Sequence, residues 1–163
     1  HHLVQCSSPL HLHLQLMSRR GKPMFKFSSS SLERMKGVDP RLREVAHLAL
    51  TISPIDFGVP EDGGLRTEDR QHALFLAGKS QIDGVNGVSN HQTGKALDFY
   101  AFVNGSASWD TQHLAMVAAA FLQAASLCGY KIKWGGFFKP FKIHNGDNFQ
   151  SGWDYPHVEI EES

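Results

Sequence analysis

An aspartate in the middle of the most strand-like segment of the chain constrains most strongly how it can fold. Residues 95–103 read KALDFYAFV, and their aromatic and β-branched content predicts a strand with Asp98 near its centre. A carboxylate within an apolar strand is costly to bury unless it is paired with a positive group or bound to a metal ion. The fold must therefore bring a partner to Asp98.

Two histidines are candidate partners for this aspartate. His91 precedes Asp98 by seven positions, at the end of a Gly-, Ser- and Asn-rich segment, 79–92, and so long a loop in a compact domain is usually functional. His157 opens the last predicted strand. If the two strands are neighbours, the three side chains form a two-histidine, one-carboxylate set, which in catalytic zinc sites leaves a fourth position for water. The spacing also allows a buried aspartate–histidine pair without a metal.

Helices and strands alternate irregularly along the chain. A capping-box spacing lies at 30–33, and N-cap residues and apolar spacing predict helices at 40–52, after Asp39; at 68–77, after Thr67; and at 111–128, between Asp110 and Gly129. Predicted strands lie at 55–59, 95–103, 130–134 and 157–160. Because no regular βαβ alternation occurs, the fold class expected is α+β, with helices packed on a small antiparallel sheet.

Composition limits the class of protein. The chain has 163 residues, of which 41% are hydrophobic and 20% charged, and this suits one globular domain. Sixteen basic residues balance sixteen acidic ones, which argues against a nucleic-acid partner. No stretch approaches the roughly 18 consecutive apolar residues of a spanning helix, so no stable membrane insertion is expected. Two cysteines cannot form a disulfide framework. We expect a monomer.

The first 23 residues differ in character from the rest. Four of the ten histidines fall within the first 13 positions, which is typical of a purification-tag remnant with a vector-derived linker, although a His-rich tract can also be a metal-binding tail. The segment lacks the basic start and apolar run of a secretory signal. We therefore expect residues 1–23 to be an added segment and residues 24–163 to form a single domain.

Two strings in the chain carry a resemblance to a known family. SNHQTGKALDF, at 89–99, and DYPHVEI, at 154–160, match the Ser-x-His-x-x-Gly-x-Ala-x-Asp signature and the later Asp/Glu-x-x-His element of the zinc D-Ala-D-Ala carboxypeptidase/VanY-like peptidases. Within that family the chain most resembles the phage-endolysin and CwlK-like L-alanyl-D-glutamate endopeptidases. The resemblance extends over about residues 24–160, with GLRT at 64–67 and Trp-Gly at 134–135. It implies a hedgehog/D-Ala-D-Ala-peptidase-like fold whose sheet carries a zinc site.

The resemblance also implies a role for each matching residue. His91, Asp98 and His157 are similar to the three ligands of one Zn²⁺ per chain. Asp154 stands in the place of the general base, beside the metal but not on it. Arg66 stands in the place of an arginine that holds the substrate carbonyl or the developing oxyanion, for which its guanidinium offers two donors. Three positions look supporting: Ser89 by hydrogen bonding, Gly94 by permitting a turn, and Trp134 before the final loop.

The implied activity is hydrolysis of the L-Ala–D-Glu bond of peptidoglycan stem peptides by an endolysin. In this family such activity degrades the cell wall and lyses the host after a holin opens the membrane. An aspartate at position 154, where other branches have glutamate, favours an L–D bond over a D–D bond. Two alternatives remain: a D,D-carboxypeptidase or dipeptidase, and a non-catalytic zinc-containing binding module like the hedgehog domain. Asp154 and Arg66 favour catalysis over the second alternative.

Some residues near these motifs have two open interpretations. Glu159 alternates with His157 along the last strand, so it either supports the site or is a surface charge. His144 lies in the loop before that strand and could line a cleft, but is not expected to be a ligand. A dense set of aromatic residues either forms a groove wall or covers the end of the sheet: Trp134, Phe137, Phe138, Phe141, Trp153 and Tyr155.

Overall fold

The computed structural model describes residues 25–138 and 154–162. The expected added segment at 1–23, together with His144, Phe141 and Trp153, lies outside the described residues, so those interpretations stay predictions. The helices are α2 (Ser29–Arg34), α3 (Pro40–Ile52), α4 (Glu68–Leu76), α5 (Thr111–Cys128) and the short 3-10 helix η1 (Gly135–Phe137). The strands are β1 (Asp56–Gly58), β2 (Ala96–Asp98), β3 (Tyr100–Val103), β4 (Ser106–Ser108), β5 (Ile132–Trp134) and β6 (His157–Ile160).

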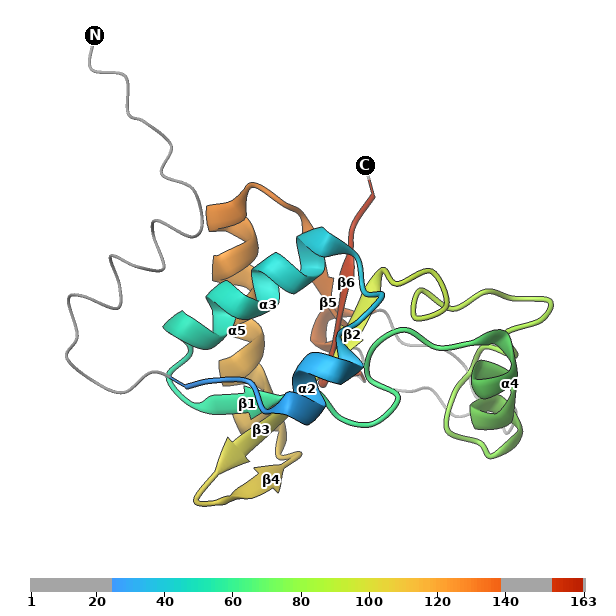
Figure 1. Ribbon diagram of the computed structural model, residues 1–163, viewed down its shortest axis with the longest axis horizontal. Coiled ribbons are helices and arrows are strands. Elements are labelled where there is room, and N and C mark those ends of the chain that lie inside the picture. The colour runs from blue at the N-terminus through green and yellow to red at the C-terminus, as the bar shows by residue number, and fades with distance from the viewer. Residues whose placement is uncertain (1–24, 139–153, 163) are drawn as a thin grey trace, which may run out of the picture.

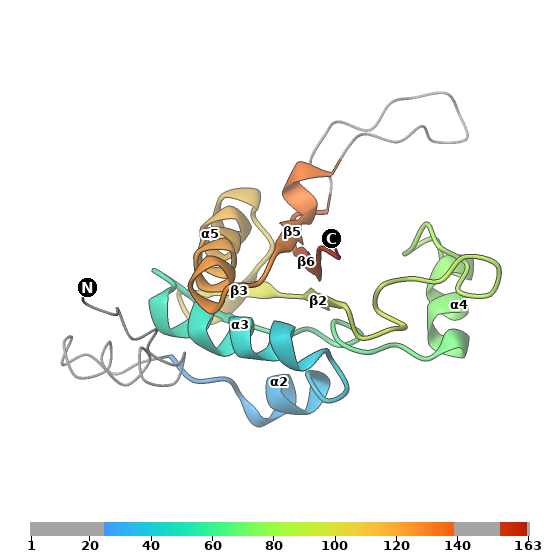
Figure 2. The same cartoon turned by 90° about the horizontal axis from the view of Figure 1, so that it is seen from above.

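The strands form two three-stranded sheets. One has the order β1-β3-β4 and the other β2-β6-β5, and every pairing is antiparallel. Helices α3 and α5 pack against each other on one side of the molecule, whereas α4 lies apart on the other side (Figures 1 and 2). The α+β class and the antiparallel pairing are confirmed, with the β-structure divided between two small sheets.

The single strand predicted at 95–103 is wrong in one respect, because it breaks at Phe99. Strand β2 ends at Asp98 and pairs with β6, and the chain then passes into β3, which pairs with β1 and β4. Phe99 is fully buried, and its ring contacts those of Phe57 and Phe121. The apolar side chain that made the segment resemble one strand therefore anchors the crossing between two sheets.

Local signals set the ends of the helices. Asp39 caps α3 by accepting a hydrogen bond from the amide of Arg41, and Thr67 caps α4 in the same way through Arg70. Helix α5 ends at Gly129, whose φ of 78° is readily adopted only by glycine. The first helix differs from expectation: its cap is Ser28, which accepts from the amide of residue 31, rather than the 30–33 capping box.

The core lies between the α3–α5 pair and the strands. Fully buried apolar residues include Leu42 and Val45 of α3, Val117 and Phe121 of α5, and Val158 of β6. Burying each large apolar side chain stabilises the fold by about 1.5–3 kcal/mol relative to exposure. Strand β6 contributes Val158 and Ile160 to this core, and His157 and Glu159 alternate with them along the strand.

Within residues 25–138 and 154–162, helix α5 is the one helix that is long and apolar enough to cross a membrane, by length and composition only. Its packing gives another reason for that apolar character, because it contacts α3, β3 and β5 and buries seven side chains in the core. The sequence-based expectation of no stable membrane insertion stays a prediction.

Candidate metal centre

Strand pairing brings together the three side chains that the sequence singled out. Asp98, the last residue of β2, lies directly opposite His157, the first residue of β6. His91 reaches the same point from the loop before β2, and both histidines are buried. Nε2 of His91 lies 3.2 Å from Oδ1 of Asp98 and 3.3 Å from Nδ1 of His157, and that Nδ1 lies 3.0 Å from the same carboxylate oxygen. The condition that the two strands be neighbours is met.

Hydrogen bonds on the outer side of each ring fix which nitrogen faces the cluster. Nδ1 of His91 lies 3.0 Å from the carbonyl oxygen of Gly64, so this nitrogen carries the proton and Nε2 presents a lone pair. Nε2 of His157 lies 2.9 Å from Oε1 of Glu159, so Nδ1 presents its lone pair when the ring is neutral. With Asp98, three acceptor atoms then face one another, and only a cation or a proton can stabilise that arrangement.

The spacing of these atoms fits a zinc ion. Ligand atoms about 2.1 Å from Zn²⁺ at tetrahedral angles lie about 3.3–3.4 Å from each other. The separations of 3.0–3.3 Å among the three ligand atoms are close to this value. Within the described residues, His91, Asp98 and His157 form the one group of histidine, cysteine and carboxylate side chains able to hold a metal ion. The donor set is suited to zinc, and neutral imidazole nitrogens also bind copper and nickel.

The charges of the cluster shift the acidity of its members. Burial by itself would raise the pKa of Asp98. The charge of His91 and the hydrogen bond from His157 outweigh that effect and hold the pKa of Asp98 far below its usual range. Burial lowers the pKa of His157, yet its hydrogen bonds to Asp98 and Glu159 outweigh that effect and raise the pKa to about 10. Both shifts follow from the close pairing of the Asp98 carboxylate with the two imidazoles.

Asp154 lies beside the cluster without joining it. Its Oδ2 is 3.7 Å from Nδ1 of His157, and its side chain is 27% exposed. Burial raises the pKa of this carboxyl, an effect that the nearby charge of Asp98 increases and that of His157 opposes. A carboxylate with raised pKa next to a metal site is well suited to accept and return a proton.

The segment that begins with Asp154 is contacted by Trp134, at the end of β5, and by Gly135, just after it. A Cβ atom on Gly135 would overlap the carbonyl oxygen of Asp154, so only glycine permits this close approach. The amide of Asp154 also donates to the carbonyl of Gly135 at 3.3 Å. Trp134 does not line the pocket; its indole Nε1 donates at 2.7 Å to the carbonyl of Tyr155, between Asp154 and His157. Through this hydrogen bond, Trp134 contacts the backbone between Asp154 and His157.

Arg66 reaches the cluster from the other side, and its guanidinium is held in three directions. Nη2 bonds Oδ2 of Asp98 at 3.1 Å, Nη1 bonds Oε1 of Gln71 at 3.1 Å, and Nε bonds the carbonyl of Asp62 at 2.7 Å. Its backbone amide donates to the carbonyl of His91. Three of its five N–H groups thus have protein partners among the described residues, and the side chain still lines the pocket.

The two other supporting positions shape the loop around His91. Oγ of Ser89 accepts a hydrogen bond from the amide of His91 at 3.2 Å. Gly94 has a φ of 74°, and a Cβ atom there would lie 2.6 Å from the carbonyl oxygen of Gly37. Their supporting roles in the site stay predictions.

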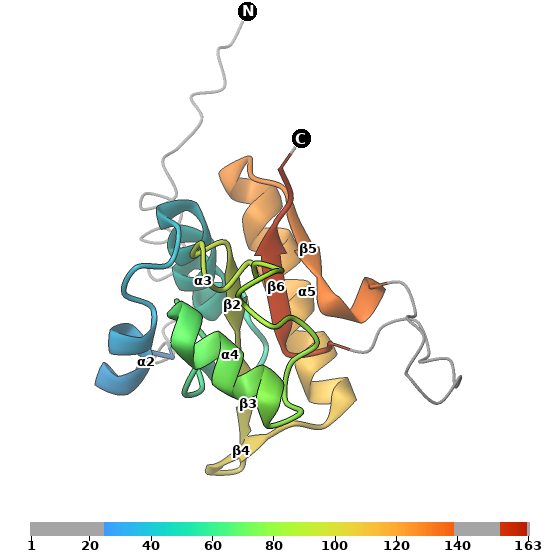
Figure 3. The ribbon, with the colours of Figure 1, turned by 90° about the vertical axis from the view of Figure 1, so that its right-hand side faces the viewer.

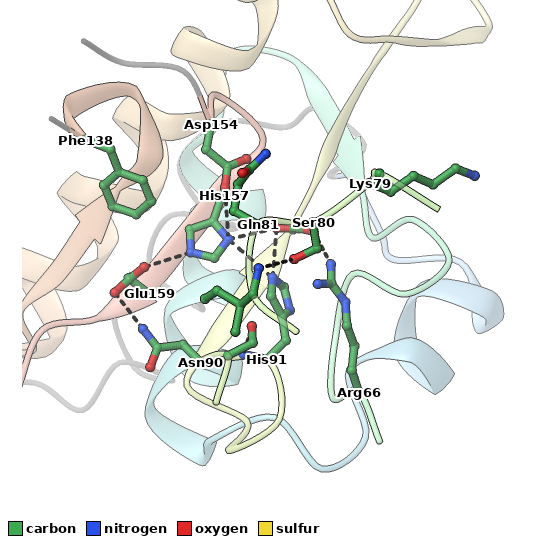
Figure 4. Close-up of a pocket in the computed structure, with 14 residues that line it drawn as sticks. Arg66, Lys79, Ser80, Gln81, Asn90, His91, Phe138, Asp154, His157 and Glu159 are labelled. Carbon is green, nitrogen blue, oxygen red and sulfur yellow. Dashed lines mark hydrogen bonds and ion pairs between the residues drawn. The ribbon is translucent and has the colours of Figure 1, made fainter. Parts of the chain in front are cut away.

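A pocket of about 300 Å³ is lined by the three candidate metal ligands together with Arg66 and Asp154. Figure 4 shows the side chains of His91, His157 and Arg66 converging, with Asp154 above them. The loop after α4 supplies a second wall, formed by residues 78–82, and Figure 3 shows α4 in front of β2 and β6. The pocket is therefore lined both by the candidate metal ligands and by the loop after α4.

Two lining residues, Glu159 and Phe138, had two open interpretations in the sequence. Glu159 supports the site, because it binds His157 through one oxygen and accepts from Asn90 at 2.8 Å through the other. The ring of Phe138 lies 5.5 Å from that of His157. Of the other aromatic residues, Trp134 is buried against Tyr155, whereas Phe137 is largely exposed. The sequence signal for Glu159 was its alternation with His157, and that for Phe138 was its place in the dense aromatic set. Nothing local marked Asn90 as a partner of Glu159.

Comparisons with known proteins agree with this geometry. The family described as phage L-alanyl-D-glutamate peptidase matches residues 23–161. The L-alanyl-D-glutamate peptidase of Escherichia phage T5 is 32% identical over 137 residues, which cover 83% of this chain and 98% of that protein. The crystal structure of the Serratia marcescens L-Ala D-Glu endopeptidase ChiX superposes with a TM-score of 0.66 at 34% identity, covering 83% of this chain and 90% of that one. The chain belongs to the phage L-alanyl-D-glutamate peptidase family.

Proposed function

We propose that this protein is a zinc-dependent peptidase that hydrolyses the L-Ala–D-Glu bond of peptidoglycan stem peptides. The observation that carries the proposal is the cluster of His91, Asp98 and His157, whose three ligand atoms lie 3.0–3.3 Å apart with the N–H groups directed outward. Asp154, whose Oδ2 lies 3.7 Å from Nδ1 of His157, would serve as the general base. The names of the similar phage T5 and Serratia proteins support the choice of bond.

His91, Asp98 and His157 would hold the ion, with Gly64 and Glu159 fixing the two rings. A bound zinc ion polarises the scissile carbonyl and lowers the pKa of a water molecule to near 7. Both imidazoles must be neutral to serve as ligands. The outer hydrogen bonds favour this role because they place the single proton of each neutral ring away from the centre.

Asp154 would move the proton during hydrolysis. As the water oxygen bonds to the L-Ala carbonyl carbon, the carboxylate accepts one proton from that water. When the carbon–nitrogen bond breaks, the same carboxyl returns the proton to the leaving amine of D-Glu. Because burial raises the pKa of this carboxyl, its carboxylate is a stronger base than that of an exposed aspartate and accepts the proton more readily.

Arg66 would have two parts in the site. It holds Oδ2 of Asp98, which leaves Oδ1 of that carboxylate for the ion. Its two remaining N–H groups stabilise negative charge on the substrate carbonyl oxygen, because a guanidinium stays charged at any working pH.

The substrate and place of action follow from the family. Residues 24–163 would act as one peptidase domain and as a monomer on the stem peptides of the cell wall. Endolysins of this kind reach the wall once a holin opens the membrane, and cleavage of the stem peptides then lyses the host.

Mass spectrometry of digested peptidoglycan tests the proposal. Purified Gram-negative peptidoglycan is incubated with the zinc-loaded protein, beside a sample treated with a chelator. We expect new peptides that begin with D-Glu and glycan strands that keep L-Ala, both lost with the chelator. Release of terminal D-Ala would instead indicate a D,D-carboxypeptidase, and the absence of any cleavage would indicate a binding module.

A further inference from the structure

A glutamine on α4, outside the pocket lining, has a completely buried side chain with a hydrogen bond at each end of its amide. Gln71 is 0% exposed. Its Oε1 accepts from Nη1 of Arg66 at 3.1 Å, and its Nε2 donates at 2.8 Å both to Oγ of Ser80 and to the carbonyl of Ile82. Both N–H groups and one of the two acceptor positions are therefore used. A single side chain thus joins the site arginine to the loop after α4.

The loop packs directly on this side chain. Gly84 has a φ of 81°, and a Cβ atom there would lie 2.7 Å from Cγ of Gln71. Ser80 and Ile82, the two loop residues that Gln71 holds, line the pocket. Gln71 therefore fixes the position of one wall of the pocket from behind.

On its other side, Gln71 acts on the candidate metal ligands through Arg66. The guanidinium bonds Gln71 through Nη1 and Asp98 through Nη2, so the two acceptors set the plane of the group between them. Asp98 in turn presents Oδ1 to the two imidazoles. A continuous chain of hydrogen bonds thus leads from the loop wall, through Gln71 and Arg66, to the carboxylate that would bind the ion.

We propose that Gln71 is a positioning residue of the peptidase site, which aligns Arg66 with Asp98 and holds the wall at residues 80–82 against the substrate. The inference rests on the proposed function, whose site it describes further. Losing the amide would leave one guanidinium N–H of Arg66 and the carbonyl of Ile82 without these partners. The guanidinium and the wall would move to find other partners.

Two substitutions separate the two contacts of Gln71. Gln71→Leu removes both, and we expect the affinity for zinc and kcat to fall about 10- to 100-fold, the usual cost of losing an outer contact of a metal site. Gln71→Glu keeps an oxygen for Arg66 but has no N–H for the loop. It should restore most of the zinc affinity while KM for a soluble muropeptide stays raised, because the wall is no longer held.

His72→Ala is the matched control. His72 lies next to Gln71 on α4 and contacts the same loop, at the carbonyl of Asp83, but does not contact Arg66. Zinc affinity of the full chain is measured by competition with a chromophoric chelator, kcat and KM by muropeptide cleavage, and folding by circular dichroism. We expect zinc affinity and kcat of the control to stay within about twofold of the unsubstituted protein.

Equal zinc affinity and kcat in folded Gln71→Leu and His72→Ala would overturn the proposal, because Gln71 would then be only a structural residue. If Gln71→Leu does not fold, Gln71→Glu decides: unchanged KM would contradict the held wall. If the unsubstituted protein binds zinc but cleaves no L-Ala–D-Glu bond, the proposed function fails. The effect of Gln71 on zinc affinity is still measured in that case, so the two failures are distinguishable.

Discussion

Asp98 and His157 are directly paired residues of two antiparallel strands, and Oδ1 of Asp98 lies 3.0 Å from Nδ1 of His157. Asp98 is the last residue of β2 and His157 is the first of β6, so the pair lies at one end of these two antiparallel strands. His91 reaches it there from a loop. The backbone of the sheet, rather than flexible side chains, thus sets the distance between two of the three candidate ligands.

Replacing Glu159 tests whether the orientation of His157 matters. Glu159→Leu removes the acceptor for Nε2 of His157, so the ring loses the contact that directs Nδ1 to the cluster. We expect zinc affinity to fall about 10- to 100-fold. Glu159→Gln should lose less, because its amide oxygen can still accept. Chelator competition measures both variants.

Glu161→Leu serves as the control for this series. Glu161 is exposed and lies two residues further along the chain, outside the pocket lining. Its replacement should leave zinc affinity unchanged. Equal losses in the Glu159 and Glu161 variants would show that the effect is one of general charge rather than of ring orientation.

Replacing Asp154 separates metal binding from proton transfer. Asp154→Asn keeps the size of the side chain but cannot accept a proton, and general-base catalysis typically contributes about 10²- to 10⁴-fold. We expect kcat to fall by that factor while one zinc per chain remains bound, as measured by elemental analysis. An Asp154→Asn protein with full wall-lysing activity would contradict the assignment of the general base.

A single methyl group at Gly135 should displace the same aspartate. In Gly135→Ala the Cβ atom would overlap the carbonyl oxygen of Asp154, so the segment that bears this residue must move. We expect a loss of cleavage of at least about tenfold, since small misplacements of a catalytic group are costly.

Gly87→Ala controls for the added methyl group, because its Cβ would meet Ile82 at an ordinary 3.5 Å. Near-normal cleavage by Gly87→Ala alongside the loss in Gly135→Ala is expected. Normal cleavage by both variants would show that Asp154 tolerates displacement.

The cap of α3 gives the fold a pH dependence that is independent of the site. The side-chain hydrogen bond from Arg41 lowers the pKa of Asp39, against the opposing effect of burial. A carboxyl with a lowered folded pKa stabilises the fold above its unfolded pKa of about 3.9, and this contribution is lost as pH falls through the folded value.

We expect Asp39→Ala to lower the free energy of unfolding by about 1 kcal/mol at pH 7, and by less at pH 3. Urea denaturation at both pH values measures the difference. Asp110→Ala is the matched control, because Asp110 is the N-cap residue of α5 without a side-chain cap hydrogen bond. A larger loss in Asp110→Ala than in Asp39→Ala would contradict this account of the cap.

Local sequence signals marked two of the three candidate metal ligands, Asp98 and His157. Asp98 interrupts an apolar strand, and His157 opens another, so a simple pairing of the two strands suffices to bring them together. The helices at 40–52 and 111–128 were predictable for a similar reason, since Asp39 and Gly129 mark their ends with local chemistry.

Features that depend on distant contacts could not be predicted. Phe99 resembles any other apolar strand residue, and only its contacts with Phe57 and Phe121 show why the strand breaks there. Gln71 is an ordinary polar residue on a largely polar helix, and its burial depends on Arg66 and on a loop nine or more residues away. Such long-range hydrogen bonds leave no periodic signal in the sequence.

Titration of the metal-free protein with zinc tests the central claim most directly. The protein is stripped with a chelator and dialysed, and cleavage of the L-Ala–D-Glu bond of a muropeptide is followed as Zn²⁺ is added, beside an Asp98→Asn variant. We expect no cleavage without metal, a rise that saturates at one zinc per chain, and little recovery in the variant. Full cleavage by the stripped protein, or equal recovery in Asp98→Asn, would contradict a catalytic zinc at His91, Asp98 and His157.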